Sequence, residues 1–193
     1  DTLYCDAEDS MLRRSCRTVL DILFYRLVTW FAPVLVFTSE EVWLDRFGSG
    51  KTSVHLEDIP SSPKEWIDNS LAEKWETIRQ VRRVVTGAIE LERQKKVIGS
   101  SLEASPVIFI AEQSLYEIIT SIDFAEICIT SSVTVVKGPP SGKSFTLDDV
   151  SGVAVSFSVA SGEKCDRCWK YVDNRGSEDS CKNICQRCSG VIG

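Results

Sequence analysis

The sequence has little of what acid–base catalysis and membrane insertion require. It contains one histidine, His55, which stands in a turn-rich stretch without a paired acid or nucleophile, so we assign it no role. The most apolar stretch, FYRLVTWFAPVLVF, is interrupted by Arg26 and Pro33 and is too short to span a bilayer. The start lacks a basic segment followed by an apolar one. We therefore expect a cytoplasmic protein that binds no membrane.

The sequence also has few prolines and no net positive charge. With six prolines and 43% hydrophobic residues in a chain of 193, the protein can bury a core of its own. The net charge of -6 argues against a protein that coats nucleic acid non-specifically. Net charge is an average over the surface, however, so a local basic patch remains compatible with it.

Cysteine, by contrast, is concentrated near the end of the sequence. Cys165 and Cys168 form one C-x-x-C pair and Cys185 and Cys188 another, with 16 residues between the pairs. This spacing is typical of a four-cysteine zinc site, because each two-residue gap turns both thiolates toward one point. Cys181 could replace Cys185, but Cys185 completes the matched pair. We predict one structural zinc, bound by Cys165, Cys168, Cys185 and Cys188.

Two other uses of these cysteines are disfavoured. A disulfide framework is expected in oxidising compartments, and without a secretory leader we expect a reducing one. Thioredoxin-like chemistry uses a single C-x-x-C at the start of a helix, whereas this sequence has two facing pairs. Four protein ligands also leave the metal no open position for catalysis, so the predicted zinc stabilises a segment too small for its own core.

The first half of the sequence has helical periodicity. Apolar residues recur in steps of three and four at Leu12, Cys16, Val19, Leu23, Leu27, Trp30 and Val34, and again at Leu71, Trp75, Ile78, Val81, Val85 and Ala88. Pro33 should end or kink the first helix. Thr38 and Glu41 resemble a capping box that opens a short second helix, and a long loop follows. We predict a small helical bundle whose cores are these apolar stripes.

The other face of the third predicted helix is basic. Six positive residues stand against two glutamates in this run, at Arg79, Arg82, Arg83, Arg93, Lys95 and Lys96. Such a local excess on an acidic protein is typical of a surface that faces phosphates. An ordinary solvated face with pairs such as Glu92 and Lys96 explains the same composition equally well, so both interpretations stand.

After Gly99 the period changes to that of strands. SPVIFIAE, AEICITSSVTVVK and GVAVSFSVA are rich in β-branched residues and flank a possible helix, QSLYEIITSI, which predicts a small α/β (α+β) module. GPPSGKS, residues 138–144, resembles a phosphate-binding loop. It has three residues between its glycines instead of four, and a strand pattern follows it, so we interpret it as a connection between strands.

These segments together resemble the C-terminal end of bacterial-type isoleucyl-tRNA synthetases. The resemblance covers nearly the whole chain and is carried by LYCDAEDS, FAPVLVFTSEEVW, SVHLEDIP, IGSSLEA and KCDRCWKY with ICQRC. The pattern around FAPVLVFTSEEVW is shared with the related valyl and leucyl enzymes. IGSSLEA followed by the four cysteines is more specific. The resemblance implies an anticodon-binding-like bundle at residues 1–97, a junction module at 98–160 and a zinc-binding domain at 161–193.

The family's other signatures are absent from this sequence. The HIGH-like and KMSKS-like motifs that bind ATP, and the editing insertion, do not occur, so we expect part of a larger enzyme that binds rather than makes bonds. The whole enzyme would attach isoleucine to its tRNA using ATP. This portion would bind the tRNA through the basic helix face and through a second surface made by Arg167, Trp169, Lys170 and Arg187. We expect no binding of DNA, and we expect the enzyme to be a monomer. Trp169 could stack on a base or cover the metal site, and of these two roles we favour packing over the metal.

Two functions from other classes compete with this one. A zinc-finger tail of a DNA glycosylase has a similar four-cysteine motif, but the helical first half and the missing catalytic base and N-terminal proline nucleophile argue against it. A protein-interaction module with a purely structural zinc is favoured slightly by the acidic net charge. Salt-dependent binding of tRNA would separate these functions.

Overall fold

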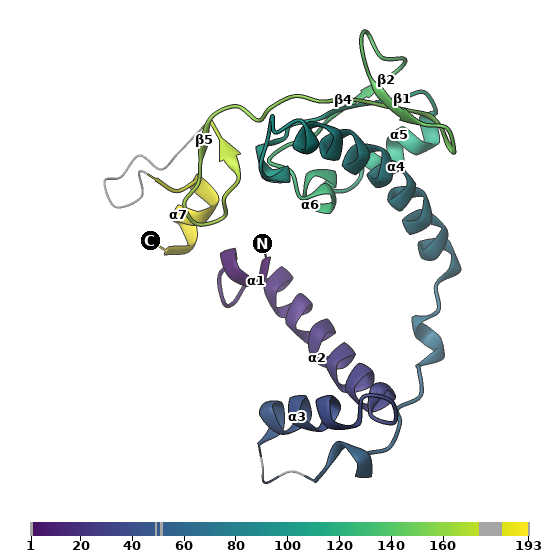
Figure 1. Cartoon of the computed structure of the whole chain (residues 1–193), viewed down its shortest axis with the longest axis vertical. Helices are drawn as coiled ribbons and strands as arrows, with labels where there is room; N and C mark the ends of the chain where they lie inside the picture. Colours follow the sequence, from purple (N-terminus) through teal and green to yellow (C-terminus); the bar gives the residue numbers. More distant parts are fainter. Residues whose placement is uncertain (1, 49, 51, 174–182, 193) are drawn as a thin grey trace. The chain divides into compact units, whose positions relative to one another are not determined.

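The computed structural model describes residues 2–48, 50, 52–173 and 183–192, and it divides the chain into two compact units (Figure 1). The first unit comprises Asp1–Ile67 and the second Asp68–Gly193. Among the described residues, none of the helices combines the length and apolar character that a bilayer crossing requires. The mainly helical first part, the sheet with helices and the buried cysteine cluster confirm the predicted fold class.

The first unit is helical, as predicted. Its elements are α1 (Thr2–Cys5), α2 (Met11–Phe31), α3 (Val36–Phe47) and the 3-10 turns η1 (Val54–Leu56) and η2 (Lys64–Trp66). The Ser10 hydroxyl caps α2 by accepting from the Arg13 amide, and α2 ends just before Pro33, which cannot continue a helix. Trp43 of α3 is the centre of a small core with Ala32 and Val54.

Two details of the first unit differ from the sequence prediction. α3 begins at Val36 after Leu35, without a side-chain cap, so the predicted capping box at Thr38 is wrong. The predicted apolar stripe, which runs along α2 and on to Val34 beyond it, is also not a core: six of its members are 42–77% exposed, at Leu12, Val19, Leu23, Leu27, Trp30 and Val34. α3 packs instead near Tyr25 and Val28. Periodicity shows which face of a helix is apolar, but not what covers that face.

The second unit contains one long helix on a mixed sheet. Its elements before the cysteines are α4 (Asn69–Gln94), η3 (Ser101–Glu103), β1 (Val107–Ile110), α5 (Gln113–Thr120), α6 (Phe124–Cys128), β2 (Thr134–Lys137), β3 (Phe145–Leu147) and β4 (Val150–Ser156). The Asp68 carboxylate caps α4 by accepting from the Leu71 amide. From Ile78 onward the predicted stripe of α4 is buried against the sheet, whereas Leu71 and Trp75 are exposed.

The sheet has the order β2-β1-β4-β3. β1 runs parallel to β2 and antiparallel to β4, and Ile108 and Ile110 stand opposite Val155 and Val153 in the β1–β4 register. Cross-strand partners share a face of a sheet, and these four side chains are all buried in the core that also holds Ile78 and Val85 of α4. The packing of α4 on the sheet therefore fixes the position of β4, the inner strand from which the chain continues to the cysteines.

One predicted strand is partly helical. AEICITSSVTVVK was expected to be extended, but its first part forms α6, capped by Asp123 and ended by Ile129 in the left-handed region at φ 56°. The β-branched residues of this stretch pack against α4 and the sheet, and this packing overrides their local preference for a strand. GPPSGKS connects β2 to β3, which confirms its interpretation as a strand connection.

Candidate functional site

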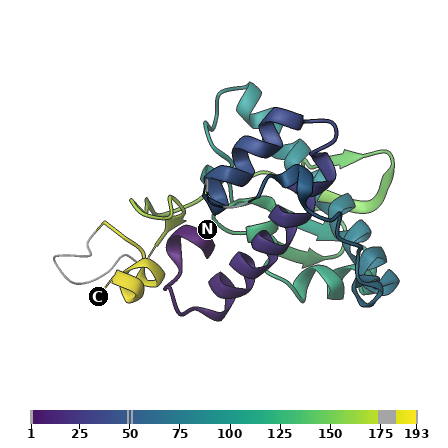
Figure 2. The same cartoon turned by 90° about the horizontal axis from the view of Figure 1, so that it is seen from below.

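The four matched cysteines come together in the last part of the second unit, which we call the cysteine module (residues 163–173 and 183–192). It contains the two-stranded pair β5 (Glu163–Lys164) and β6 (Tyr171–Val172), and α7 (Gln186–Ile192). β5, β6 and α7 lie side by side in both views (Figures 1 and 2). The first C-x-x-C forms the turn between the strands, and the second stands where α7 begins.

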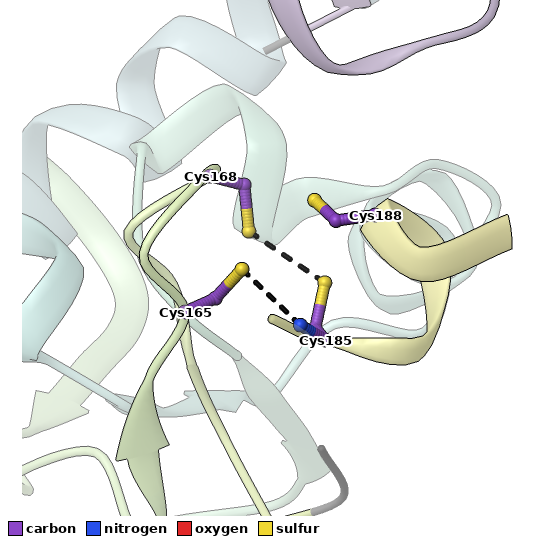
Figure 3. Close-up of side chains that lie close together, drawn as sticks. All are labelled: Cys165, Cys168, Cys185 and Cys188. Carbon is purple, nitrogen blue, oxygen red and sulfur yellow. Dashed lines mark hydrogen bonds between the residues drawn. The ribbon is translucent and has the colours of Figure 1, made fainter. Parts of the chain in front are cut away.

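The four thiols converge on one point (Figure 3). Cys165, Cys168, Cys185 and Cys188 are all buried, and their sulfur atoms lie within 4.8 Å of one another. The Sγ atoms of Cys168 and Cys185 are 3.8 Å apart. In a tetrahedron with metal–sulfur bonds of about 2.3 Å, neighbouring sulfurs are about 3.8 Å apart. The donor set therefore fits a closed tetrahedral metal site.

Short backbone hydrogen bonds give each pair its shape. The Trp169 amide donates to the Cys165 carbonyl at 2.8 Å and the Cys165 amide donates to the Lys170 carbonyl at 2.9 Å, so the first turn is closed from both sides. The Cys185 amide donates to the Cys165 sulfur at 3.2 Å. This bond joins the two pairs directly. Such N–H donors toward sulfur are what a thiolate ligand requires around it.

The thiols differ in how readily they ionise. Burial opposes ionisation of Cys165, but backbone N–H groups of Cys168, Cys185 and Arg167 outweigh it and lower the pKa to about 6. Burial raises the pKa of Cys168 to about 11. Burial, reinforced by the neighbouring sulfurs, also raises the pKa of Cys188, against a hydrogen bond from the Arg167 side chain. A bound cation would be needed to hold all four sulfurs as thiolates.

The fifth nearby cysteine, Cys181, lies outside the described residues, so the alternative ligand set that contains it stays untested. None of the seven described cysteines forms a disulfide with another described residue. Cys165, Cys168, Cys185 and Cys188 form one cluster, as the two matched C-x-x-C pairs predicted.

Most of the basic side chains predicted on α4 are exposed but already paired. Their partners are acidic side chains in four pairs: Arg79 with Glu76 at 2.7 Å, Arg83 with Asp149 at 2.9 Å, Arg93 with Glu90 at 3.0 Å and Lys95 with Glu92 at 2.7 Å. Exposed pairs of this kind contribute about 0–1 kcal/mol to stability. They can therefore open when a stronger anion approaches. Lys96 follows α4 in the left-handed region at φ 60°.

Arg82 is different from its neighbours on α4. Its side chain is partly buried, and its Nε donates to the Ile127 carbonyl at the end of α6 at 2.8 Å. The last carbonyls of a helix have no partner within the helix, so this bond satisfies one of them. Arg82 thus joins α4 to α6, a role that its position in the basic stripe did not indicate.

The four predicted contacts on the cysteine module are also placed in different ways. Trp169 is 58% exposed and adopts φ 65°, and the Lys164 ammonium lies 5.6 Å from its ring centre. Arg167 lies against the thiols, as described above. Lys170 and Arg187 both point to Glu126 of α6, at 3.2 Å and 3.7 Å. Sequence reasoning missed Glu126, because it stands in the segment that was expected to be a strand.

Comparison with known proteins adds two findings. A family described as "Anticodon-binding domain of tRNA ligase" matches residues 1–108. Curated proteins called "Isoleucine--tRNA ligase" match the entire chain: those of Brucella abortus biovar 1 (strain 9-941) and Bartonella henselae are 49% identical over 192 residues, and that of Ruegeria pomeroyi is 46% identical over 193. The chain spans about a fifth (20%) of the length of these relatives. The matches confirm the resemblance found in the sequence.

Proposed function

Since the chain belongs to the anticodon-binding domain family of tRNA ligases, we propose that it is the tRNA-binding, anticodon-side portion of an isoleucine--tRNA ligase. The observation that carries this proposal is the match over 192–193 residues to relatives that are 46–49% identical and bear that name. The whole enzyme would attach isoleucine to its tRNA in the cytoplasm using ATP. This portion would contribute binding, because the ATP-binding signatures are absent from its sequence.

The basic face of α4 is the proposed contact with the tRNA backbone. Arg79, Arg83, Arg93 and Lys95 are held only by exposed ion pairs, so exchanging a carboxylate for a phosphate costs little. Lys96 lies just beyond the end of the helix and is the last basic residue of the proposed contact. Arg82 was predicted with the same basic residues, but its side chain donates to the Ile127 carbonyl of α6 and so joins α4 to α6. Contacts of this kind position an RNA without reading its sequence.

The cysteine module offers a second surface, with Trp169 at its centre. More than half of this side chain is exposed, and the backbone holds it in a conformation that bulky residues rarely adopt. The sequence favours packing over the metal, but a ring as exposed as this one suits stacking on an unpaired base better. Lys164 beneath the ring adds positive charge. The other proposed contacts of this module are Arg167, Lys170 and Arg187, of which Lys170 and Arg187 also interact with Glu126.

We propose zinc as the metal of the cysteine cluster. Four thiolates at tetrahedral spacing are a ligand set typical of structural zinc, and the four ligands are Cys165, Cys168, Cys185 and Cys188. The metal would supply the folding free energy that so small a module lacks. The bound metal would then keep the side chains of the module in position to contact the tRNA. We propose that this tRNA is the isoleucine acceptor and that the enzyme binds it as a monomer.

The proposal is tested by titrating the full-length enzyme with isoleucine tRNA and with an unrelated tRNA at several salt concentrations. We expect preference for isoleucine tRNA and affinity that falls steeply as salt rises, because phosphate contacts release counterions. If log affinity is plotted against log salt concentration, replacing Arg79 and Arg83 by alanine should make the slope less steep by up to about 0.7–0.9 for each lost phosphate contact. Equal binding of both tRNAs would overturn the proposal.

A further inference from the structure

A single carboxylate contacts both halves of the cysteine module. Glu126 Oε1 lies 3.2 Å from Lys170 Nζ and 3.7 Å from Arg187 Nη1. Lys170 follows the first C-x-x-C closely, and Arg187 stands within the second. The Lys170 side chain is only 17% exposed, so water screens this pair less than the exposed pairs on α4. Glu126 therefore holds the two cysteine pairs to α6 through one atom.

A second anchor lies at Ser131, beyond the end of α6. The Ser131 hydroxyl donates to the Leu102 carbonyl at 2.5 Å and accepts the Tyr171 amide of β6 at 2.7 Å. A serine hydroxyl has one hydrogen to donate and lone pairs to accept with, so both bonds can form together. Leu102 belongs to IGSSLEA, the segment that the resemblance marked as specific. This segment thus connects to the cysteine module through one serine.

The platform that carries both anchors is itself fixed. Arg82 joins α6 to α4, and the Ser131 amide donates to the Ala104 carbonyl at 3.2 Å. Within IGSSLEA, Ser100 and Glu103 form a reciprocal capping box around η3. The anchors therefore stand on backbone that is tied to the core of the unit rather than on free loops.

We propose that Glu126 and Ser131 are positioning residues that dock the cysteine module on α6 and IGSSLEA in one orientation. Docking sets where Trp169 is presented, and in this respect the inference rests on the proposed tRNA-binding function. Lys170 and Arg187 then serve as the cations of this docking contact. Neither Glu126 nor Ser131 is a metal ligand, so removing either leaves the zinc in place.

Amide hydrogen exchange of the zinc-loaded 193-residue chain tests docking directly. The Tyr171 amide is bonded across the docking contact, whereas the Cys165 amide is bonded inside the module to Lys170. Glu126→Gln should speed exchange at Tyr171 about three- to tenfold, as expected for the loss of a partly shielded charge pair, without affecting Cys165. Glu126 does not touch the Tyr171 amide, so acceleration there shows that the two anchors act as one docking contact.

Matched controls are available in the second unit, outside the cysteine module. Glu117→Gln removes a carboxylate from α5 that pairs with Gln113, and Ser132→Ala removes a hydroxyl that bonds to Ser105; neither contacts the cysteine module. Both should leave Tyr171 exchange unchanged. If Glu126→Gln also leaves it unchanged, or if Cys165 accelerates as much as Tyr171, docking by Glu126 is overturned.

Binding of isoleucine tRNA by the full-length enzyme tests the consequence. We expect Glu126→Gln to bind about three- to tenfold more weakly than Glu117→Gln, with equal zinc content. Faster Tyr171 exchange with unchanged tRNA affinity would support docking and overturn its role in tRNA binding. If the unaltered enzyme did not select isoleucine tRNA, the proposed function would fall, while the exchange experiment would still decide whether the module docks.

Discussion

Replacing Arg82 by alanine should destabilise the second unit, although this residue stands in a stripe of apparently equivalent arginines. The partly buried guanidinium donates to the Ile127 carbonyl, and its removal leaves that carbonyl without a partner. Hydrogen bonds to a charged group contribute about 1.5–3 kcal/mol, and an unsatisfied buried acceptor costs about 1–3 kcal/mol. We therefore expect a loss of about 1.5–3 kcal/mol in the free energy of unfolding.

Arg79→Ala is the matched control for this variant. Arg79 is on the same helix and pairs only with the exposed Glu76, so its removal should change the free energy of unfolding by about 0.5 kcal/mol or less. Urea unfolding followed at the amide signals of β1 and β4 reports on the second unit alone. If Arg82→Ala and Arg79→Ala have the same midpoint and slope, the bond to Ile127 contributes nothing and α6 is held by its apolar contacts.

Three further predictions concern the cysteine module. Gly162→Ala should disrupt the β5–β6 pair, because Gly162 has φ 85° and an added Cβ would lie 2.3 Å from a backbone oxygen of β6. The control Gly142→Ala places its Cβ in open space and should leave the pair intact. Circular dichroism and zinc content of the two variants check this. Cys185→Ser should lose zinc, whereas Cys181→Ser should keep it. If metal analysis shows the reverse pattern, Cys181 and not Cys185 is the ligand. Zinc affinity, measured by competition with a chelator, should rise between about pH 6 and 8, because the raised pKa of Cys168 means that zinc must displace its proton; affinity that ignores pH would contradict this.

The sequence was sufficient for the parts of the protein that depend on spacing. Two C-x-x-C pairs predict four ligands because the constraint is local, and the thiols are indeed clustered. Helix α2 ends before Pro33 for an equally local reason. The motif around GPPSGKS was rejected as a phosphate loop from its residue count, and the structure places it between two strands.

Features that depend on tertiary contacts could not be predicted in this way. α6 replaces an expected strand because its apolar side chains pack on the core of the second unit. The exposure of the apolar stripe on α2 could not be predicted, because periodicity shows which face of a helix is apolar and does not show which element covers that face. Arg82 and Arg83 are adjacent in sequence, yet one supports α6 and the other pairs with Asp149, since neighbouring residues on a helix point to different surroundings.

The central claim is that this portion binds the anticodon side of isoleucine tRNA. The most direct test is the affinity of the full-length enzyme for isoleucine tRNA and for the same tRNA with its anticodon bases substituted. We expect the substitutions to weaken binding by roughly 1–3 kcal/mol for each lost stacked base, and Trp169→Ala to abolish part of this discrimination. If the anticodon-substituted tRNA binds as tightly as the native one, the anticodon is not recognised and the account is wrong.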